Sequence, residues 1–110
     1  MKKAHRVKKG TEIEAIIKTR QSVGNSYFVL YKKKNHEQDH FRFALSVPKK
    51  YGIAVKRNKI KRQIRDIVSK LDIAPQVDLF LVVKPKANEL SFVDIKNNVE
   101  QLVRKQDIMR

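Results

Sequence analysis

The sequence predicts one small α/β domain spanning residues 1–110, and several kinds of segment support this fold class. One segment is rich in aromatic and β-branched residues, another alternates apolar and polar residues, and another is nearly all apolar, so each favours a β-strand. Other segments repeat apolar residues at helical spacing. In chain order the segments read αββαβα, which is a small α-β sandwich. A chain of 110 residues can bury one core without disulfides or metals.

The chain is expected to begin with an arm and a helix. Residues 1–9 are basic and are predicted to be a partly extended N-terminal arm. Thr11–Glu14 has the pattern of a capping box, in which a threonine and a glutamate three residues later satisfy free amides at a helix start. The helix is predicted to run to about Arg20. Its apolar stripe consists of Ile13, Ile16 and Ile17.

Two strands are predicted next. Residues 21–26 are mostly polar and turn-like. Residues 27–31 form a strand by composition, and residues 41–47 alternate in the manner of a half-buried strand. The charged residues 32–40 between them are expected to form a hairpin loop.

The second half is predicted to hold a helix, a strand and a helix. After a loop over residues 48–55, a basic helix runs from about Lys56 to Lys70. Residues 77–83 are nearly all apolar, as expected for an inner strand covered on both faces. Residues 41–83 are therefore predicted to form a crossover between parallel strands. Ser91 resembles the N-cap of a last helix, with Asp94 at the box position. Its apolar stripe is Ile95, Val99, Leu102 and Val103.

The basic helix is two-sided. Residues 56–65 carry six positive charges in ten residues yet keep isoleucine at helical spacing. At about 100° per residue, apolar side chains fall on one arc and polar ones on a neighbouring arc. The apolar arc consists of Ile60, Ile64, Ile67, Val68 and Leu71. The basic arc consists of Arg57, Asn58, Lys61, Arg62 and Arg65. Such a helix can bury one face and present the other rigidly to phosphates.

The charge distribution favours a nucleic-acid partner. The net charge is +15, far more than solubility requires. Residues 2–9 hold five basic side chains and residues 49–65 hold eight, and neither block contains an acid. We expect the two blocks to meet on one face of the fold; the alternative is two unrelated solvated segments.

Other function classes find little support. The chain has no cysteine, no apolar run of about 20 residues and no signal-peptide pattern after its first residues, so a cytoplasmic protein is expected. His5, His36 and His40 show no ligand spacing, and no glycine loop could cradle phosphates. The carboxylates at 66, 72 and 78 could in principle bind Mg²⁺, but their context is typical of surface or helix-end charges. No catalytic residue and no metal site is predicted.

The segment from Leu45 to Arg65 carries a specific pattern. It contains Ser-Val-x-Lys-Lys, then Ala-Val, then Arg-Asn-x-x-Lys-Arg-x-x-Arg. This series closely resembles the protein component of bacterial ribonuclease P. The resemblance extends in the same order to Arg6–Lys9, Ser22–Val23 and Phe28–Tyr31, and so covers essentially the whole chain.

The resemblance implies a fold and a function. The fold would be the ribosomal-protein-S5-domain-2-like α-β sandwich, whose βαβ crossover is left-handed, although general chain geometry favours a right-handed one. The function would be that of the protein subunit of a ribonucleoprotein endonuclease, a hydrolase that removes the 5′ leader during tRNA processing. The RNA subunit would carry the chemistry with Mg²⁺ at its active site. The implied partners are the ribonuclease P catalytic RNA and precursor tRNA, with neither membrane nor DNA.

The resemblance also assigns binding residues. The catalytic RNA would contact phosphate-binding side chains on and near the basic helix: Arg57, Asn58, Lys61, Arg62, Arg65, Lys49, Lys50 and Arg6. Asn58 would either bind RNA or cap the helix N-terminus, and Arg65 could instead be an ordinary solvated charge.

The precursor leader would lie in a cleft between the first helix and the sheet, lined by Ile13, Ile17, Val29 and Tyr31. Tyr31 would either stack on a base or belong to the core edge. Relatives commonly carry phenylalanine where Ile13 and Ile17 stand, and isoleucine cannot stack. Pro48 and Ile53 likewise replace a usual serine and asparagine before the basic helix.

Three other functions fit parts of the sequence. A non-enzymatic RNA-binding protein of ribosomal-protein or RNA-chaperone type fits the charge but does not explain the ordered motifs. A DNA-binding helix-turn-helix protein conflicts with the strands predicted on both sides of the basic helix. An autonomous nuclease lacks a recognisable active site.

Overall fold

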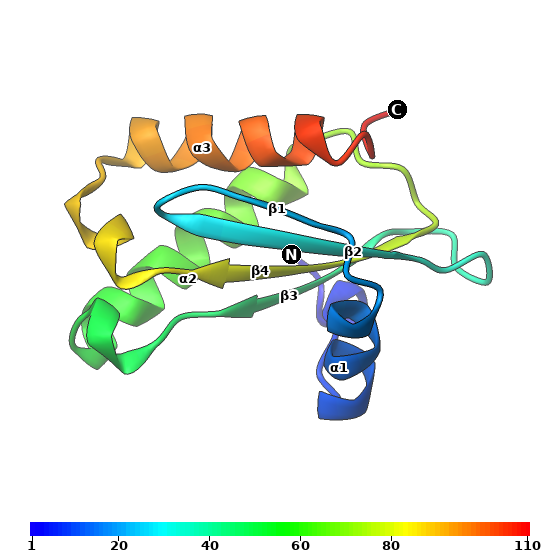
Figure 1. The fold of residues 1–110 in the computed structure, drawn as a ribbon, viewed down its shortest axis with the longest axis horizontal. Helices are drawn as coiled ribbons and strands as arrows, with labels where there is room; N and C mark the ends of the chain where they lie inside the picture. The colour runs from blue at the N-terminus through cyan, green and yellow to red at the C-terminus, as the bar shows by residue number, and fades with distance from the viewer.

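The computed structural model describes residues 1–110 and contains one mixed β-sheet with helices on both faces (Figure 1). The fold class predicted from the sequence is confirmed. The helices are α1 (Gly10–Lys18), α2 (Ala54–Ser69) and α3 (Phe92–Lys105). The strands are β1 (Ser22–Gly24), β2 (Phe28–Lys34), β3 (Arg42–Ser46) and β4 (Val77–Val83). Short 3-10 turns are η1 (Lys3–His5), η2 (Lys49–Tyr51) and η3 (Pro85–Glu89).

The strand order in the sheet is β1-β2-β4-β3. The β1–β2 and β2–β4 pairs are antiparallel, whereas β3 and β4 are parallel and are connected through α2. The predicted parallel crossover over residues 41–83 is therefore confirmed. Strand β4 is also the inner strand that its apolar sequence predicted, because it lies between β2 and β3.

Two predictions for the first half were wrong. Residues 32–40 are not a hairpin loop, because β4 lies between β2 and β3, and β2 continues to Lys34. Charged side chains do not prevent this, since the pairing uses backbone groups. Residues 21–26 are not only a turn, because Ser22–Gly24 forms the edge strand β1. The turn itself is held by Asn25, whose Oδ1 accepts hydrogen bonds from the amides of Tyr27 and Phe28 at 2.8 and 2.9 Å.

Helix starts differ in part from the sequence prediction. Helix α1 begins at Gly10, and its N-cap Lys9 receives no side-chain hydrogen bond, so the capping box at Thr11–Glu14 is not formed. Helix α2 begins at Ala54 with Ile53 at the N-cap, which excludes the N-cap role considered for Asn58. In α3, the Ser91 hydroxyl accepts a hydrogen bond from the Asp94 amide at 3.2 Å, which confirms that cap.

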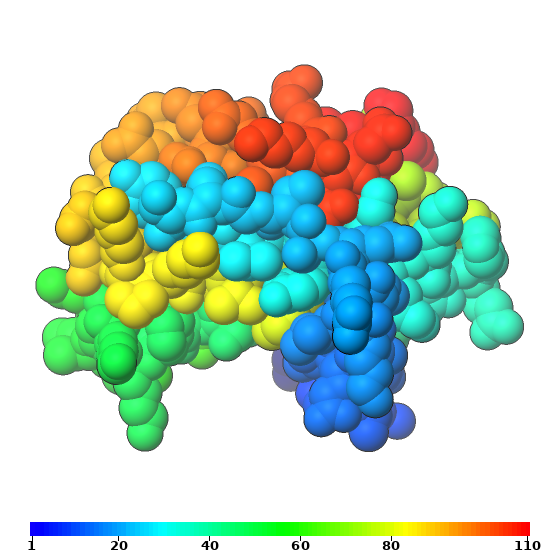
Figure 2. Space-filling model, in the orientation of Figure 1, coloured from blue at the N-terminus to red at the C-terminus, as the bar shows by residue number.

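The sheet separates two unequal cores. Helices α2 and α3 cover one face and bury 20 residues there, including the predicted stripe of α3 and four of the five residues of the predicted apolar arc of α2. The fifth, Leu71, lies beyond the end of α2 and is only partly buried against this core. On the opposite face α1 covers only part of the sheet and buries a small cluster of Val7, Ile16, Ala44 and Phe80. Figure 2 shows α1 (blue) standing out from the body, with a hollow between it and the green segment that leads into α2. One sheet face is therefore closed and the other is partly open.

Arg42 holds α1 to the open face. Its guanidinium donates to both carboxylate oxygens of Asp78 on the paired strand, at 3.0 and 2.8 Å, and forms an ion pair with Glu12 of α1 at 2.8 Å. Asp78 is only 3% exposed, so the expectation that it is a surface or helix-end carboxylate was wrong. Burial alone would raise the pKa of Asp78, but the hydrogen bonds and charge of Arg42, helped by Gln38 and Asn35, lower it.

Thr19 attaches the C-terminal end of α1 to the sheet. The Thr19 hydroxyl bonds to the carbonyl oxygens of Ile16 and of Lys32 in β2, at 2.7 and 2.8 Å. With Arg42 at the other end, α1 is fixed at both of its termini.

None of the helices is both long enough and apolar enough to span a membrane.

Replacing Asp78 with asparagine should lower the free energy of unfolding by about 2 kcal/mol, because Arg42 loses its charged partner in a mostly buried position. Chemical denaturation at pH 7 measures this. The Asp78 pKa is lower in the folded protein than its ordinary value of 3.8, so its contribution is present above that pH and is lost as the pH falls. The variant should therefore show a shallower loss of stability below about pH 5.

Asp72→Asn is the matched control. Asp72 pairs with Arg110 on the surface, where the two side chains are 63% and 61% exposed, so its loss should cost less than about 1 kcal/mol. Equal effects of the two substitutions would show that the buried pair does not stabilise the fold.

Candidate nucleic-acid interface

Helix α2 presents its predicted basic arc outward. The apolar arc is buried against the sheet and α3, which fixes the rotation of the helix about its axis. Along the adjoining side Asn58 and Arg62 are exposed and Arg57, Lys61 and Arg65 are half-buried. Lys49 and Lys50 are exposed in η2, immediately before the helix. The sequence-predicted residues of η2 and α2 thus lie on consecutive elements and are at least partly exposed.

The charges of this surface are not neutralised within the protein. The ion pairs in the structure join Arg42 to Glu12 and Asp78, Lys70 to Asp66, and Arg110 to Asp72. None involves the seven basic residues predicted to bind RNA. Because like charges held together on one helix repel each other, an external polyanion would be bound favourably there.

Arg6 brings the N-terminal arm to this surface. The arm runs beside β3, where the Val7 amide donates to the Phe43 carbonyl at 3.0 Å. Burial lowers the pKa of Arg65, and the positive charge of Arg6 lowers it further, so the two guanidinium groups are close. This interaction agrees with the predicted meeting of the two basic blocks, which stays a prediction for their other residues. The Arg6 Nε is buried without a hydrogen-bond partner, and the Arg6 Nη2 donates to the Met1 carbonyl at 3.5 Å.

The loop before α2 is compatible with its unusual residues. Pro48 precedes η2, where its fixed φ suits a helix start, and Ile53 at the α2 N-cap is 68% exposed. The Arg57 Nε donates to the Gly52 carbonyl at 3.2 Å and thereby connects α2 to this loop. Arg57 therefore has a structural contact as well as a charge available for phosphate.

The residues predicted for leader binding lie on the open sheet face. Val29 and Tyr31 point to this face from β2, and Ile13 and Tyr31 pack at the margin of the small core under α1. Ile17 is 40% exposed on the same helix. The Tyr31 ring stacks on Phe80 with 6.0 Å between centroids, yet remains half-exposed. The face therefore offers apolar and aromatic surface to a single strand, and Tyr31 also has a packing role.

Polar groups lie at one end of the same face. A cavity of about 230 Å³ between α1 and the sheet is bordered by Glu12, Lys33, Asn35, Arg42 and Asp78. Sequence reasoning did not assign Lys33 or Arg42 to any site. An aspartate inside the apolar segment 77–83 was a signal that a buried cationic partner existed, but only the β3–β4 register shows that it is Arg42.

The remaining candidates show no catalytic or metal arrangement. His5 and His40 stack on each other with 3.4 Å between ring centroids, and no three His, Asp or Glu side chains are grouped as metal ligands. Asp66 and Asp72 are surface carboxylates paired with basic side chains, as expected from the sequence. Helix α2 follows a 3-10 turn and precedes β4, an arrangement unlike a helix-turn-helix motif.

Comparisons with known proteins agree with one family. The family model described as Ribonuclease P matches residues 1–107. The chain is 40% identical to the ribonuclease P protein component of Acholeplasma laidlawii, over 99% of this chain and 95% of that protein. It is 38% identical to the component from Levilactobacillus brevis, over 94% and 90% of the two chains.

Solved structures give the same result. The RNase P protein of Staphylococcus aureus is similar with a TM-score of 0.89 and 38% identity, covering 98% of this chain and all of that one. The RNase P protein from Thermotoga maritima has a TM-score of 0.80 and 26% identity, covering 91% and 96% of the two chains.

Replacing Lys61, Arg62 and Arg65 together with glutamine should weaken binding to a bacterial ribonuclease P RNA without unfolding the protein. Each lost phosphate contact removes counterion release, so the slope of log affinity against log salt should fall in magnitude by about 2 to 3. Filter binding across a salt series measures the slope, and circular dichroism checks the fold.

The control replaces Lys96, Arg104 and Lys105 of α3 with glutamine, which removes the same charge from exposed positions outside the predicted surface. If both triple variants lose the same slope, binding is a response to net charge and not to the α2 surface.

Proposed function

We propose that this chain, which belongs to the ribonuclease P protein family, holds the catalytic RNA on its α2 surface and the precursor leader on its open sheet face. The chain is a protein subunit of ribonuclease P, the ribonucleoprotein endonuclease that matures the 5′ ends of tRNA. Two surfaces, the basic side of α2 and the open sheet face, support this proposal.

The observation that carries the first half of the proposal is the uncompensated charge of α2. Arginine and lysine side chains without acidic partners stand on a helix whose rotation is fixed by its buried face. Because the helix backbone is already fixed, binding a phosphate backbone would order only these side chains, which limits its entropic cost. Arg6 and Arg65 extend the surface to the edge of the sheet beside β3.

The second half rests on the open face under α1. A leader strand crossing β2 would meet Val29 and the half-exposed ring of Tyr31, with Ile17 on one side. Contacts of this kind tolerate different sequences, because every base has an apolar face. Isoleucine at positions 13 and 17 leaves Tyr31 as the aromatic platform among the predicted leader residues.

The proposal places the chemistry on the RNA. Mg²⁺ would be bound at the RNA active site and would activate the water that attacks the phosphodiester. The protein would contribute by offsetting the repulsion between the phosphates of the two RNAs, which lowers the concentration of Mg²⁺ needed for their association. A cytoplasmic location, where precursor tRNA is processed, fits this role.

The decisive measurement is cleavage of precursor tRNA at low Mg²⁺ by a bacterial ribonuclease P RNA, with and without the protein. We expect strong stimulation and a correct mature 5′ end. Absence of stimulation with the cognate RNA would contradict the proposal. Cleavage by the protein alone would place an active site on this chain.

Replacing Tyr31 with leucine should weaken binding of precursor tRNA to the holoenzyme by about 1 kcal/mol, because a stacking platform is lost while most of the volume is kept. Mature tRNA, which has no leader, serves as the control and should bind unchanged. Equal weakening for both RNAs would mean that Tyr31 supports the fold and does not contact the leader.

A further inference from the structure

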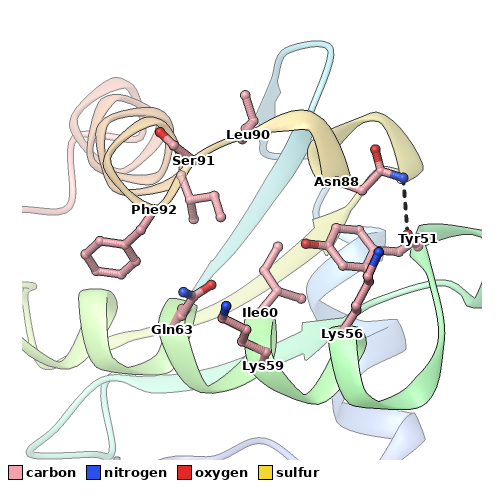
Figure 3. Close-up of a pocket in the computed structure, with 10 residues that line it drawn as sticks. Tyr51, Lys56, Lys59, Ile60, Gln63, Asn88, Leu90, Ser91 and Phe92 are labelled. Atoms are coloured by element: carbon pink, nitrogen blue, oxygen red, sulfur yellow. Dashed lines mark hydrogen bonds between the residues drawn. The ribbon is translucent and has the colours of Figure 1, made fainter.

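A second polar cavity lies on the far side of α2, away from the surfaces described above. It has a volume of about 580 Å³, the largest in the structure, and lies between α2, η2, η3 and the start of α3. Its size is within the range of pockets that hold small ligands or single nucleotides. Figure 3 shows its wall, with α2 below and α3 above.

Helix α2 lines this cavity with a third arc of side chains. Lys56, Lys59 and Gln63 are spaced by three and four residues and therefore share one side of the helix. Around the helix axis, the outward face lies between this side and the predicted basic arc. The apolar arc, which faces the sheet, borders this side on its other edge. Neither lysine forms an ion pair, and none of the lining residues is acidic. The cavity is consequently positive.

The other walls provide a ring surface and polar groups. Phe92, in the first turn of α3, is 44% exposed and projects toward the α2 side of the cavity (Figure 3). The Tyr51 ring is buried, but its hydroxyl points into the cavity and has no partner in the protein (Figure 3). Asn88 donates to the Tyr51 carbonyl at 3.3 Å and so joins η3 to η2. Lys59 and Gln63 lie between Phe92 at one end of the cavity and Lys56 at the other (Figure 3). An exposed phenylalanine and a neighbouring unpaired lysine can bind both parts of a nucleotide.

We propose that this cavity is a second RNA subsite, in which an unpaired nucleotide of the catalytic RNA stacks its base on Phe92 and places its phosphate near Lys59, while Lys56 at the other end of the cavity attracts the adjoining phosphate. The Tyr51 hydroxyl and the Gln63 amide would hydrogen-bond the base or ribose. The inference rests on the proposed function, because it requires α2 to lie against the RNA.

Two features favour RNA over a protein as the occupant. The lysines match the charge of a phosphate and no acidic residue lines the wall, so a basic protein segment would be repelled. The cavity also shares α2 with the predicted RNA-binding arc, so an RNA held on one side of the helix could reach the other with an unpaired nucleotide. The catalytic RNA would then contact helix α2 on two sides.

The absence of tryptophan from the chain provides a specific probe. Phe92→Trp introduces a single indole at the cavity wall, whose fluorescence should be quenched when a base stacks on it. Val93→Trp is the matched control, since Val93 is 62% exposed in the same helical turn but does not line the cavity. The full-length variants are titrated with ribonuclease P RNA, and binding is followed in parallel by filter retention.

We expect saturable quenching for Phe92→Trp at the RNA concentration that gives binding, and at least twofold less for Val93→Trp. Equal or absent quenching with intact binding would overturn the subsite and leave the proposed function standing. Loss of binding by the unmodified chain would overturn both.

Charge variants test the lysines independently. Lys56→Gln combined with Lys59→Gln should reduce the magnitude of the salt slope by roughly 1 to 2 and lower the quenching of the indole in the Phe92→Trp background. The control is Arg104→Gln combined with Lys105→Gln, which removes the same charge from the C-terminal end of α3, outside the cavity. It should leave the quenching unchanged. Identical losses in the two double variants would overturn the phosphate contact.

Discussion

The burial of one side of α2 is the constraint on which the rest of the structure depends. Four of its side chains, Ile60, Ile64, Ile67 and Val68, are at most 4% exposed. Their burial supplies hydrophobic free energy against the self-repulsion of a chain with a net charge of +15. It also sets the direction of every charged side chain on the helix, so that the stability of the fold and the proposed RNA contacts depend on the same packing.

On the other face of the sheet, the ion pairs of Arg42 hold α1 in position. Without Arg42 between Glu12 and Asp78, α1 would be attached mainly by the small cluster around Ile16 and Phe80. The limited area of that cluster is what leaves Val29 and Tyr31 accessible. A larger core under α1 would stabilise the domain further but would cover the surface proposed for the leader.

Several features of the structure depend only on neighbouring residues, and the sequence predicts these features correctly. The pleat of residues 27–31 and 41–47, the apolar arc of α2 and the Ser91 cap all follow from neighbouring residues and are found as expected. The errors arose where distant segments meet. Strand β4 inserts between β2 and β3, so no hairpin forms. The partner of Asp78 is set by a register that the sequence does not encode locally. The sequence alone does not predict a role for Lys56 and Lys59, because the cavity that they line depends on α3 lying opposite them.

The pairing of Arg6 with Phe43 has a consequence for self-association. Strand β3 is an edge of the sheet, and the unpaired backbone of an edge strand can template contact with another molecule. Here the N-terminal arm occupies part of that edge through a single bridge, and its lysines keep a second positively charged copy at a distance. The arm that carries Arg6 toward the proposed RNA surface would thus also limit edge-to-edge association of the free protein.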